Sequence, residues 1–106
     1  MQQEIDYALL GVNIKKKRQN MGLTQEKLAE MTGCNPSHIS NIENNYTKVS
    51  LNTLLAIANT LDTSIDSLLM EQYNNPSLAL DNELSKVIAD CDIEMKQRIL
   101  RIIKVL

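Results

Sequence analysis

Two short segments, each opened by a helix-capping residue and separated by one glycine, constrain this 106-residue chain more than any other feature. Gly22 and Gly33 are typical helix stops, because glycine readily adopts the left-handed conformation that ends many helices. Thr24 follows the first stop and can cap a new helix. Asn35 follows the second stop, and Pro36 suits the first helical position after it. The pattern predicts one helix over about 24–32 and another over about 36–44, joined by a tight turn.

Three further helices are expected to pack around this pair. One spans about 6–20, Ser50 can cap a fourth helix, and Ser64 can cap a short fifth. Apolar residues recur at helical spacing in all five segments and are expected to build one core. They are Leu10, Ile14, Leu28, Ala29, Met31, Ile39, Ile42, Leu51, Leu54, Leu55, Ile57, Ala58, Leu61, Ile65, Leu68 and Leu69.

The composition also favours helices. The apolar residues are almost all aliphatic, with no Trp and no Phe, and only 3 Gly and 2 Pro interrupt them. Such a chain is suited to helices packed on helices. We therefore expect an all-α fold, with a five-helix domain over 1–71 and a C-terminal helical hairpin over 78–106. The polar run QYNNPS at 72–77 is the expected linker.

The C-terminal segment has a strong apolar stripe. A helix is expected over 78–89, and Asp92 can cap a last helix that runs to Leu106. A helix this apolar requires a partner. We favour dimerisation through the last helix, but the segment could instead fold back on its own domain or bind another protein, such as an antagonist or a toxin. The expected dimerisation residues are Ile99, Leu100, Ile102, Ile103 and Leu106.

Positive charge is concentrated in the first half of the chain. The window from Lys15 to Lys48 holds six Lys or Arg residues against three Glu, whereas the whole chain carries a formal charge of -2. This asymmetry predicts one anion-facing surface. Two cysteines do not make a disulfide framework, and the N-terminus lacks a signal-peptide pattern. With no apolar run of membrane-spanning length, a cytoplasmic protein with reduced thiols is expected.

The two capped segments have the geometry of a helix-turn-helix. The second helix would present small polar side chains outward, among them Ser37, His38 and Asn41. The major groove of DNA admits one helix, and such side chains can bond to base edges there. Helix N-termini near Thr24 and Asn35 can meet phosphate oxygens. The sequence therefore predicts a partner of double-stranded DNA.

The residues in this register resemble a known family. Three stretches carry the resemblance: Gly22-Leu23-Thr24-Gln25-Glu26-Lys27-Leu28-Ala29, then Ser37-His38-Ile39-Ser40-Asn41-Ile42-Glu43, and then Leu51, Leu54, Ile57, Ala58 and Leu61. They are similar to the Cro/lambda-repressor-like (XRE) helix-turn-helix family. The resemblance covers about residues 7–70. It implies a five-helix DNA-binding domain in a transcriptional regulator. We expect a repressor that binds inverted-repeat operators as a dimer.

The resemblance also assigns roles to residues. Base-facing positions are Pro36, Ser37, His38 and Asn41. Other residues are expected to contact phosphates, on the basis of the resemblance, of the helix N-termini and of the lysine run. They are Lys16, Lys17, Thr24, Gln25, Asn44 and Lys48. Arg18 and Glu43 match a structural ion pair of the family. Asn13 stands where relatives often carry Arg, so no phosphate contact is expected there, and Asn45 stands at a usual glycine position.

Other functions have weaker support in the sequence. His38 and Cys34 could belong to a metal site, but no further ligand lies at a suitable spacing, so we expect no metal and no cofactor. Cys34 is expected to be a buried, unreactive thiol. No Ser/His/Asp or Cys/His set is arranged for catalysis, so an enzyme is not expected. An antitoxin or adaptor is the alternative to the regulator.

Overall fold

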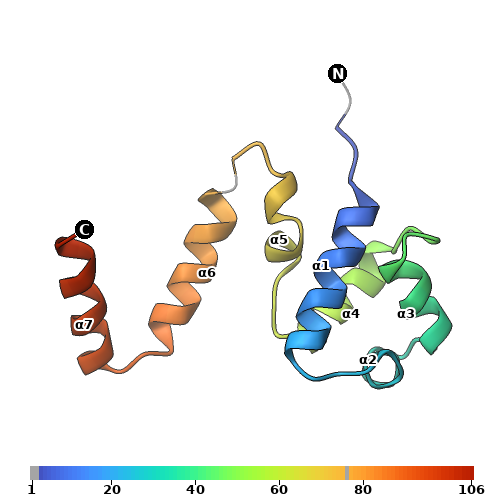
Figure 1. The fold of residues 1–106 in the computed structure, drawn as a ribbon, viewed down its shortest axis with the longest axis horizontal. Helices are drawn as coiled ribbons and strands as arrows, with labels where there is room; N and C mark the ends of the chain where they lie inside the picture. The colour runs from blue at the N-terminus through green and yellow to red at the C-terminus, as the bar shows by residue number, and fades with distance from the viewer. Residues whose placement is uncertain (1–2, 76) are drawn as a thin grey trace. The chain divides into compact units, whose positions relative to one another are not determined.

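The computed structural model describes residues 3–75 and 77–106, and it divides into two compact units. The first unit runs to Asn74 and the second begins at Asn75. Figure 1 shows the course of the chain through its helices. No strand occurs in the described ranges, so the all-α prediction is confirmed.

The first unit contains five α-helices and a terminal 3-10 turn within its described residues. They are α1 (Tyr7–Asn20), α2 (Gln25–Thr32), α3 (Pro36–Glu43), α4 (Leu51–Thr60), α5 (Ile65–Leu68) and η1 (Met70–Gln72). The prediction placed the start of α2 one residue too early and the end of α3 one residue too late. These differences concern only the half-helical end residues.

Each α-helix of this unit begins at a side chain that accepts a hydrogen bond from the backbone N–H three residues further on. The five capping residues are Asp6, Thr24, Asn35, Ser50 and Ser64. Gly22 and Gly33 have φ values of 71° and 74°, so both stops use the left-handed conformation. The turn between α2 and α3 is therefore set by local sequence.

The core is made of aliphatic side chains from all five helices. Its buried members are Leu10, Ile14, Leu28, Ala29, Ile39, Ile42, Val49, Leu54, Ile57, Ala58, Leu61 and Leu68, and Tyr7, Leu23, Cys34, Ile65 and Leu69 pack against them. The expectation for Met31 was wrong, because its side chain is 52% exposed. Gln25, Leu28, Ala29 and Thr32 form the less exposed side of α2 instead, which turns Met31 outward.

Two leucines of α4 were also expected in the core and lie outside it. Leu51 is 72% exposed and Leu55 is 51% exposed. The buried stripe of the helix follows Leu54, Ile57 and Ala58, at the spacing that one packed face requires. Leu51 lies at the first position of α4, and Leu55 projects about 100° away from Leu54.

Helix α1 connects several parts of the first unit. Asn13 Nδ2 donates a hydrogen bond to the Leu68 carbonyl at 3.1 Å, which ties α1 to α5. Asp6 and Gln72 exchange two hydrogen bonds, from the Asp6 N–H to Gln72 Oε1 at 2.7 Å and from Gln72 Nε2 to the Asp6 carbonyl at 3.1 Å. The start of α1 is thereby fastened to η1.

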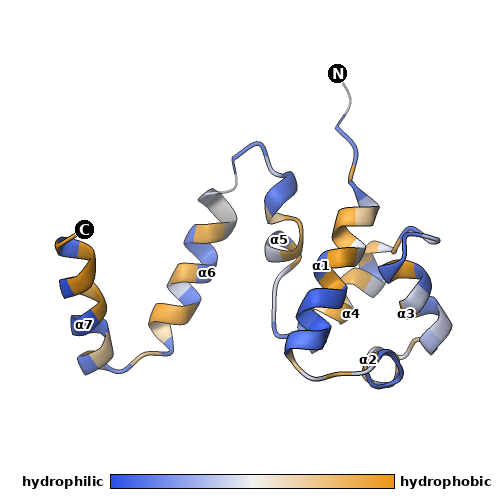
Figure 2. Cartoon of the chain, in the orientation of Figure 1, coloured by the Kyte–Doolittle hydropathy of each residue, from blue (hydrophilic) through white to orange (hydrophobic). Residues whose placement is uncertain are grey.

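The second unit consists of α6 (Ser77–Ala89) and α7 (Ile93–Lys104). Asp92 caps α7 by accepting from the Met95 N–H at 2.8 Å. The predicted helix to Leu106 ends two residues earlier, at Lys104. Among the residues of this unit whose burial is described, Cys91 and Ile99 are half-buried and the others are exposed. Figure 2 shows apolar residues alternating with hydrophilic ones along both helices.

None of the described helices is both long and apolar enough to cross a membrane.

Candidate DNA-binding surface

Helix α3 presents a polar face of small side chains. Pro36, Ser37 and Asn41 are exposed, and His38 is half-buried beside them. The opposite side of the helix is held by Ile39 and Ile42, which are 0% and 3% exposed. A short helix with one side locked in a core and the other side polar can be inserted into a groove without rearrangement.

The first turn of α3 is fixed by its capping residue. Asn35 Oδ1 accepts from the His38 N–H at 2.8 Å and from the Ser37 hydroxyl at 2.7 Å. Because the hydroxyl hydrogen of Ser37 points to the cap, the Ser37 oxygen keeps its lone pairs for an outside donor. Ser37 is thus placed as an acceptor, which suits an amino group on a base edge.

The end of α3 is held by a buried ion pair. Arg18 Nε donates to Glu43 Oε2 at 2.7 Å, and Arg18 Nη2 donates to Glu43 Oε1 at 3.0 Å. The Glu43 side chain is 0% exposed. The hydrogen bond to Glu43 is the main cause that raises the pKa of Arg18 above its ordinary value. Two parallel charge-assisted bonds fix both distance and orientation between α1 and α3.

Two further bonds extend this pair into a junction of three helices. Arg18 Nη1 donates to the Leu23 carbonyl at 2.7 Å, in the connection that leads into α2. Gln25 Nε2 donates to Glu43 Oε1 at 3.0 Å, from the first residue of α2. Arg18, Gln25 and Glu43 therefore set the relative positions of both helices of the helix-turn-helix.

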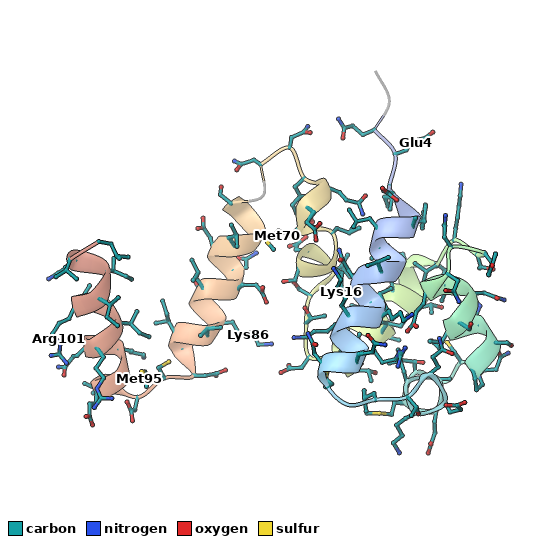
Figure 3. The ribbon with its side chains drawn as sticks, viewed as in Figure 1. Glu4, Lys16, Met70, Lys86, Met95 and Arg101 are labelled. Atoms are coloured by element: carbon teal, nitrogen blue, oxygen red, sulfur yellow. The ribbon has the colours of Figure 1, made fainter. Side chains whose placement is uncertain are left out.

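The sequence-predicted phosphate positions lie on three separate parts of the first unit. Lys16, labelled in Figure 3, is exposed on α1, and Lys17 beside it is half-buried. Thr24 is exposed at the N-terminus of α2, where its side chain accepts from the Lys27 N–H at 3.0 Å. That helix end presents unpaired backbone N–H groups, which bind anions.

Gln25 follows Thr24 as the first residue of α2, and the remaining two positions, Asn44 and Lys48, belong to the loop after α3. Asn44 is exposed and donates from Nδ2 to Ser40 Oγ at 3.2 Å. Asn45 has a φ of 62°, so it takes the left-handed conformation that its usual glycine equivalent would adopt. Lys48 is exposed, and its ammonium nitrogen lies 5.5 Å from the centre of the Tyr7 ring.

Tyr7 is a member of this surface that the sequence did not single out. Its ring packs on the core and meets Lys48 at a distance typical of a cation–π contact. The two residues are 41 positions apart, so no helical spacing relates them. The only signal in the sequence was the rarity of aromatic residues, which are 3% of the chain.

The described residues contain no group of three or more His, Cys, Asp or Glu that could hold a metal ion. Cys34 is half-buried against the core and Cys91 is half-buried in the second unit, and both are free thiols. Neither cysteine lies in a set of potential ligands.

An anchored, polar α3, a fixed turn and cationic residues around it define a helix-turn-helix DNA-binding domain. The helix-turn-helix family matches residues 14–68, which is more than half of the chain. The chain belongs to the Cro/lambda-repressor-like (XRE) helix-turn-helix family, whose members are DNA-binding transcriptional regulators.

Two named relatives are a control protein and a transcriptional regulator. Control protein C.SmaI of Serratia marcescens is 36% identical over 64 residues, which cover 60% of this chain and 76% of that protein. The HTH-type transcriptional regulator SinR of Bacillus subtilis (strain 168) is 33% identical over 84 residues, which cover 77% of this chain and 76% of SinR. The second match is longer than the first structural unit, so it extends into the second unit.

Solved structures with this fold include complexes with DNA. One is SinR, the master regulator for biofilm formation, crystallised in complex with DNA. The match covers 57% of this chain and 97% of the SinR chain, with a TM-score of 0.54 and 36% identity. The P22 c2 repressor in complex with a synthetic operator matches 57% of this chain and 91% of that chain, with a TM-score of 0.54 and 32% identity.

Proposed function

We propose that this protein is a sequence-specific transcriptional repressor that binds an inverted-repeat operator as a homodimer, with α3 in the major groove. The observation that carries the proposal is the buried Arg18–Glu43 pair, which joins α3 to α1 while the polar face of α3 stays exposed. The P22 c2 repressor and SinR, both crystallised with DNA, support a shared mode of binding.

Sequence would be read by few side chains. Ser37, His38 and Asn41 offer hydrogen-bonding groups, and Pro36 offers only apolar contact. Asn can bond an adenine edge through both its donor and its acceptor. With so few reading groups, specificity would depend on two copies reading two half-sites about one helical turn apart.

Affinity would come largely from phosphate contacts. The proposed contacts are the Lys16, Lys17 and Lys48 ammonium groups, the Gln25 and Asn44 amides, and the α2 N-terminus at Thr24. Each neutralised phosphate releases a counterion, so the binding constant would fall steeply with salt.

The test begins with selection of bound duplexes from a random DNA pool, followed by fluorescence anisotropy at several salt concentrations. We expect an enriched inverted repeat and salt-sensitive binding. Asn41→Ala should cost about 1–3 kcal/mol at one base pair and relax selection there. Lys16→Ala is the matched control and should weaken all duplexes equally. An absence of any enriched sequence for the wild-type protein would rule out sequence-specific regulation.

A second candidate function is an antitoxin or adaptor whose C-terminal helices bind a partner protein. The exposed apolar side chains of α7 favour it, because Leu100, Ile102 and Ile103 are 51–60% exposed in a single chain. Light scattering of the purified chain separates the two candidates. A dimer supports self-pairing, and a monomer supports a missing protein partner.

A further inference from the structure

Among its described residues, the second unit has an apolar surface but no buried apolar residue. In α6, Leu80, Leu84, Val87 and Ile88 form one stripe and are 38–61% exposed. In α7, the stripe consists of Met95, Ile99, Ile102 and Ile103. A groove of about 250 Å³ between the two helices is lined by Ile88, Ile99, Leu100 and Ile103, together with Lys96. Pairing within one chain therefore leaves both stripes open.

The edges of the α6 stripe are acidic. Asp81 lies three residues before Leu84, so it flanks one side of the stripe, and Glu83 lies four residues before Val87, so it flanks the other. Both carboxylates are exposed.

The edges of the α7 stripe are basic. Lys96 lies three residues before Ile99 and contributes to the wall of the groove. Arg98 lies four residues before Ile102, on the opposite edge. Its guanidinium bonds Glu94 at 3.1 Å, but both side chains are more than half exposed. An exposed pair of this kind contributes little, so Arg98 can exchange its partner.

The two charge patterns decide how two copies would meet. Pairing α7 with α7 would bring basic edges, from Lys96 and Arg98, against basic edges. Pairing α6 with α6 would bring acidic edges, from Asp81 and Glu83, against acidic edges. Pairing α6 with α7 of a second copy puts acidic edges against basic edges on both sides of the apolar seam. Only the crossed arrangement avoids like charges.

We propose that the occupant of this surface is a second copy of the chain, and that α6 of each copy packs on α7 of the other. The proposal rests on the homodimer of the proposed function and adds α6 to an interface expected from α7 alone. A two-fold axis then generates two identical α6–α7 contacts. Leu80, Leu84 and Val87 become interface residues together with Ile99, Ile102 and Ile103.

Charge reversal in the full-length protein tests the crossed arrangement. One variant carries Asp81→Lys with Glu83→Lys, and the other carries Lys96→Glu with Arg98→Glu. Sedimentation gives the dimer dissociation constant of each variant alone. It should rise about tenfold or more above that of wild type, because every edge contact becomes repulsive. An equimolar mixture should form a heterodimer, and a chain with all four substitutions should dimerise as wild type does.

Asn82→Lys and Arg101→Glu are the matched controls, since both lie on the far faces of their helices, and both should dimerise normally. Rescue in the four-fold variant without rescue in the mixture would place the charge pairing within one chain and overturn the proposal. Undiminished self-association of both variants would also overturn it. This test does not depend on DNA. If wild type dimerises and the mixture of variants forms a heterodimer, but no operator is bound, only the regulator function is refuted.

Discussion

Gly11 of α1 lies directly against the backbone of Ile42 in α3. A Cβ atom on Gly11 would be 2.5 Å from the Ile42 carbonyl oxygen and 2.7 Å from that of Glu43. The glycine is needed here for space, since its own backbone is helical. The main chain of α1 thus supports the end of α3 without any side chain between them.

Gly11→Ala should therefore displace α3 and destabilise the first unit. Overpacking against a backbone carbonyl costs about 1–3 kcal/mol, because neither helix can yield without loss of its other contacts. Thermal unfolding should show a lower midpoint. Val12→Ala, one position further on an exposed side chain, is the control and should change little. A Gly11→Ala protein as stable as wild type would show that α1 and α3 can separate at this contact without cost.

Glu43→Gln hardly changes the shape of the side chain but should strongly destabilise the first unit. It leaves the Arg18 guanidinium without its counterion at a buried position, and loss of one partner of such a pair costs about 3–5 kcal/mol. Chemical denaturation measures the loss. The double variant Arg18→Met with Glu43→Leu should be more stable than the sum of the single changes predicts, because no charge is then stranded. Additive losses would show that the two residues do not interact.

Helix starts were predictable from sequence because their causes are local. Thr24, Asn35 and Asp92 each accept from an N–H three residues away, so residue type and spacing determine the cap. Contacts between distant segments were accessible only where the family register supplied them, as for Arg18 and Glu43. The Asn13 bond to the Leu68 carbonyl and the Tyr7 contact with Lys48 had no such guide.

The errors in the core have the same origin. Apolar character at Met31, Leu51 and Leu55 predicted burial, yet each short helix has only one face turned to its neighbours. Which face is turned inward depends on the packing of all five helices together. The spacing of apolar residues shows that a helix has one buried face. It does not show which residues form that face when the helix has more apolar residues than the face can hold.

The Tyr7 ring should make a measurable contribution to DNA binding through Lys48. Tyr7→Leu removes the aromatic face that holds the ammonium group. The affinity for DNA should fall about twofold to fivefold, which corresponds to the free energy of an exposed cation–π contact. Tyr7→Phe keeps the face and should bind as wild type. Fluorescence anisotropy provides the affinities. Equal losses for Leu and Phe would assign the effect to the hydroxyl group and not to the ring.

Lys48→Ala should reduce the salt dependence of binding itself. Removal of one phosphate contact lowers the slope of log affinity against log salt by about one. Lys27→Ala is a matched control, because Lys27 pairs with Glu30 at 3.7 Å on an exposed surface and is not among the proposed contacts. An unchanged slope in the Lys48 variant would remove this residue from the phosphate-binding set.

Asn45→Gly should stabilise the loop after α3. Asn45 has a φ of 62°, a region where glycine has no steric penalty, so a gain of up to about 1 kcal/mol is expected. Asn44→Gly is the counterpart, since Asn44 has a φ of -97° and gains nothing from glycine. The denaturation midpoint should rise for Asn45→Gly and should not rise for Asn44→Gly. A destabilised Asn45→Gly variant would show that the Asn45 side chain contributes more than its backbone costs.

The double hydrogen bond between Asp6 and Gln72 fixes the point from which the chain leaves the first unit. Helix α1 begins beside that point, and its last turn holds Glu43 through Arg18. One rigid helix thus links the exit of the chain to the end of α3. In the proposed homodimer, insertions after Asn74 would alter the effective concentration of the second copy without disturbing how each copy reads its half-site. Evolution can consequently tune occupancy of an operator and choice of its sequence as separate traits.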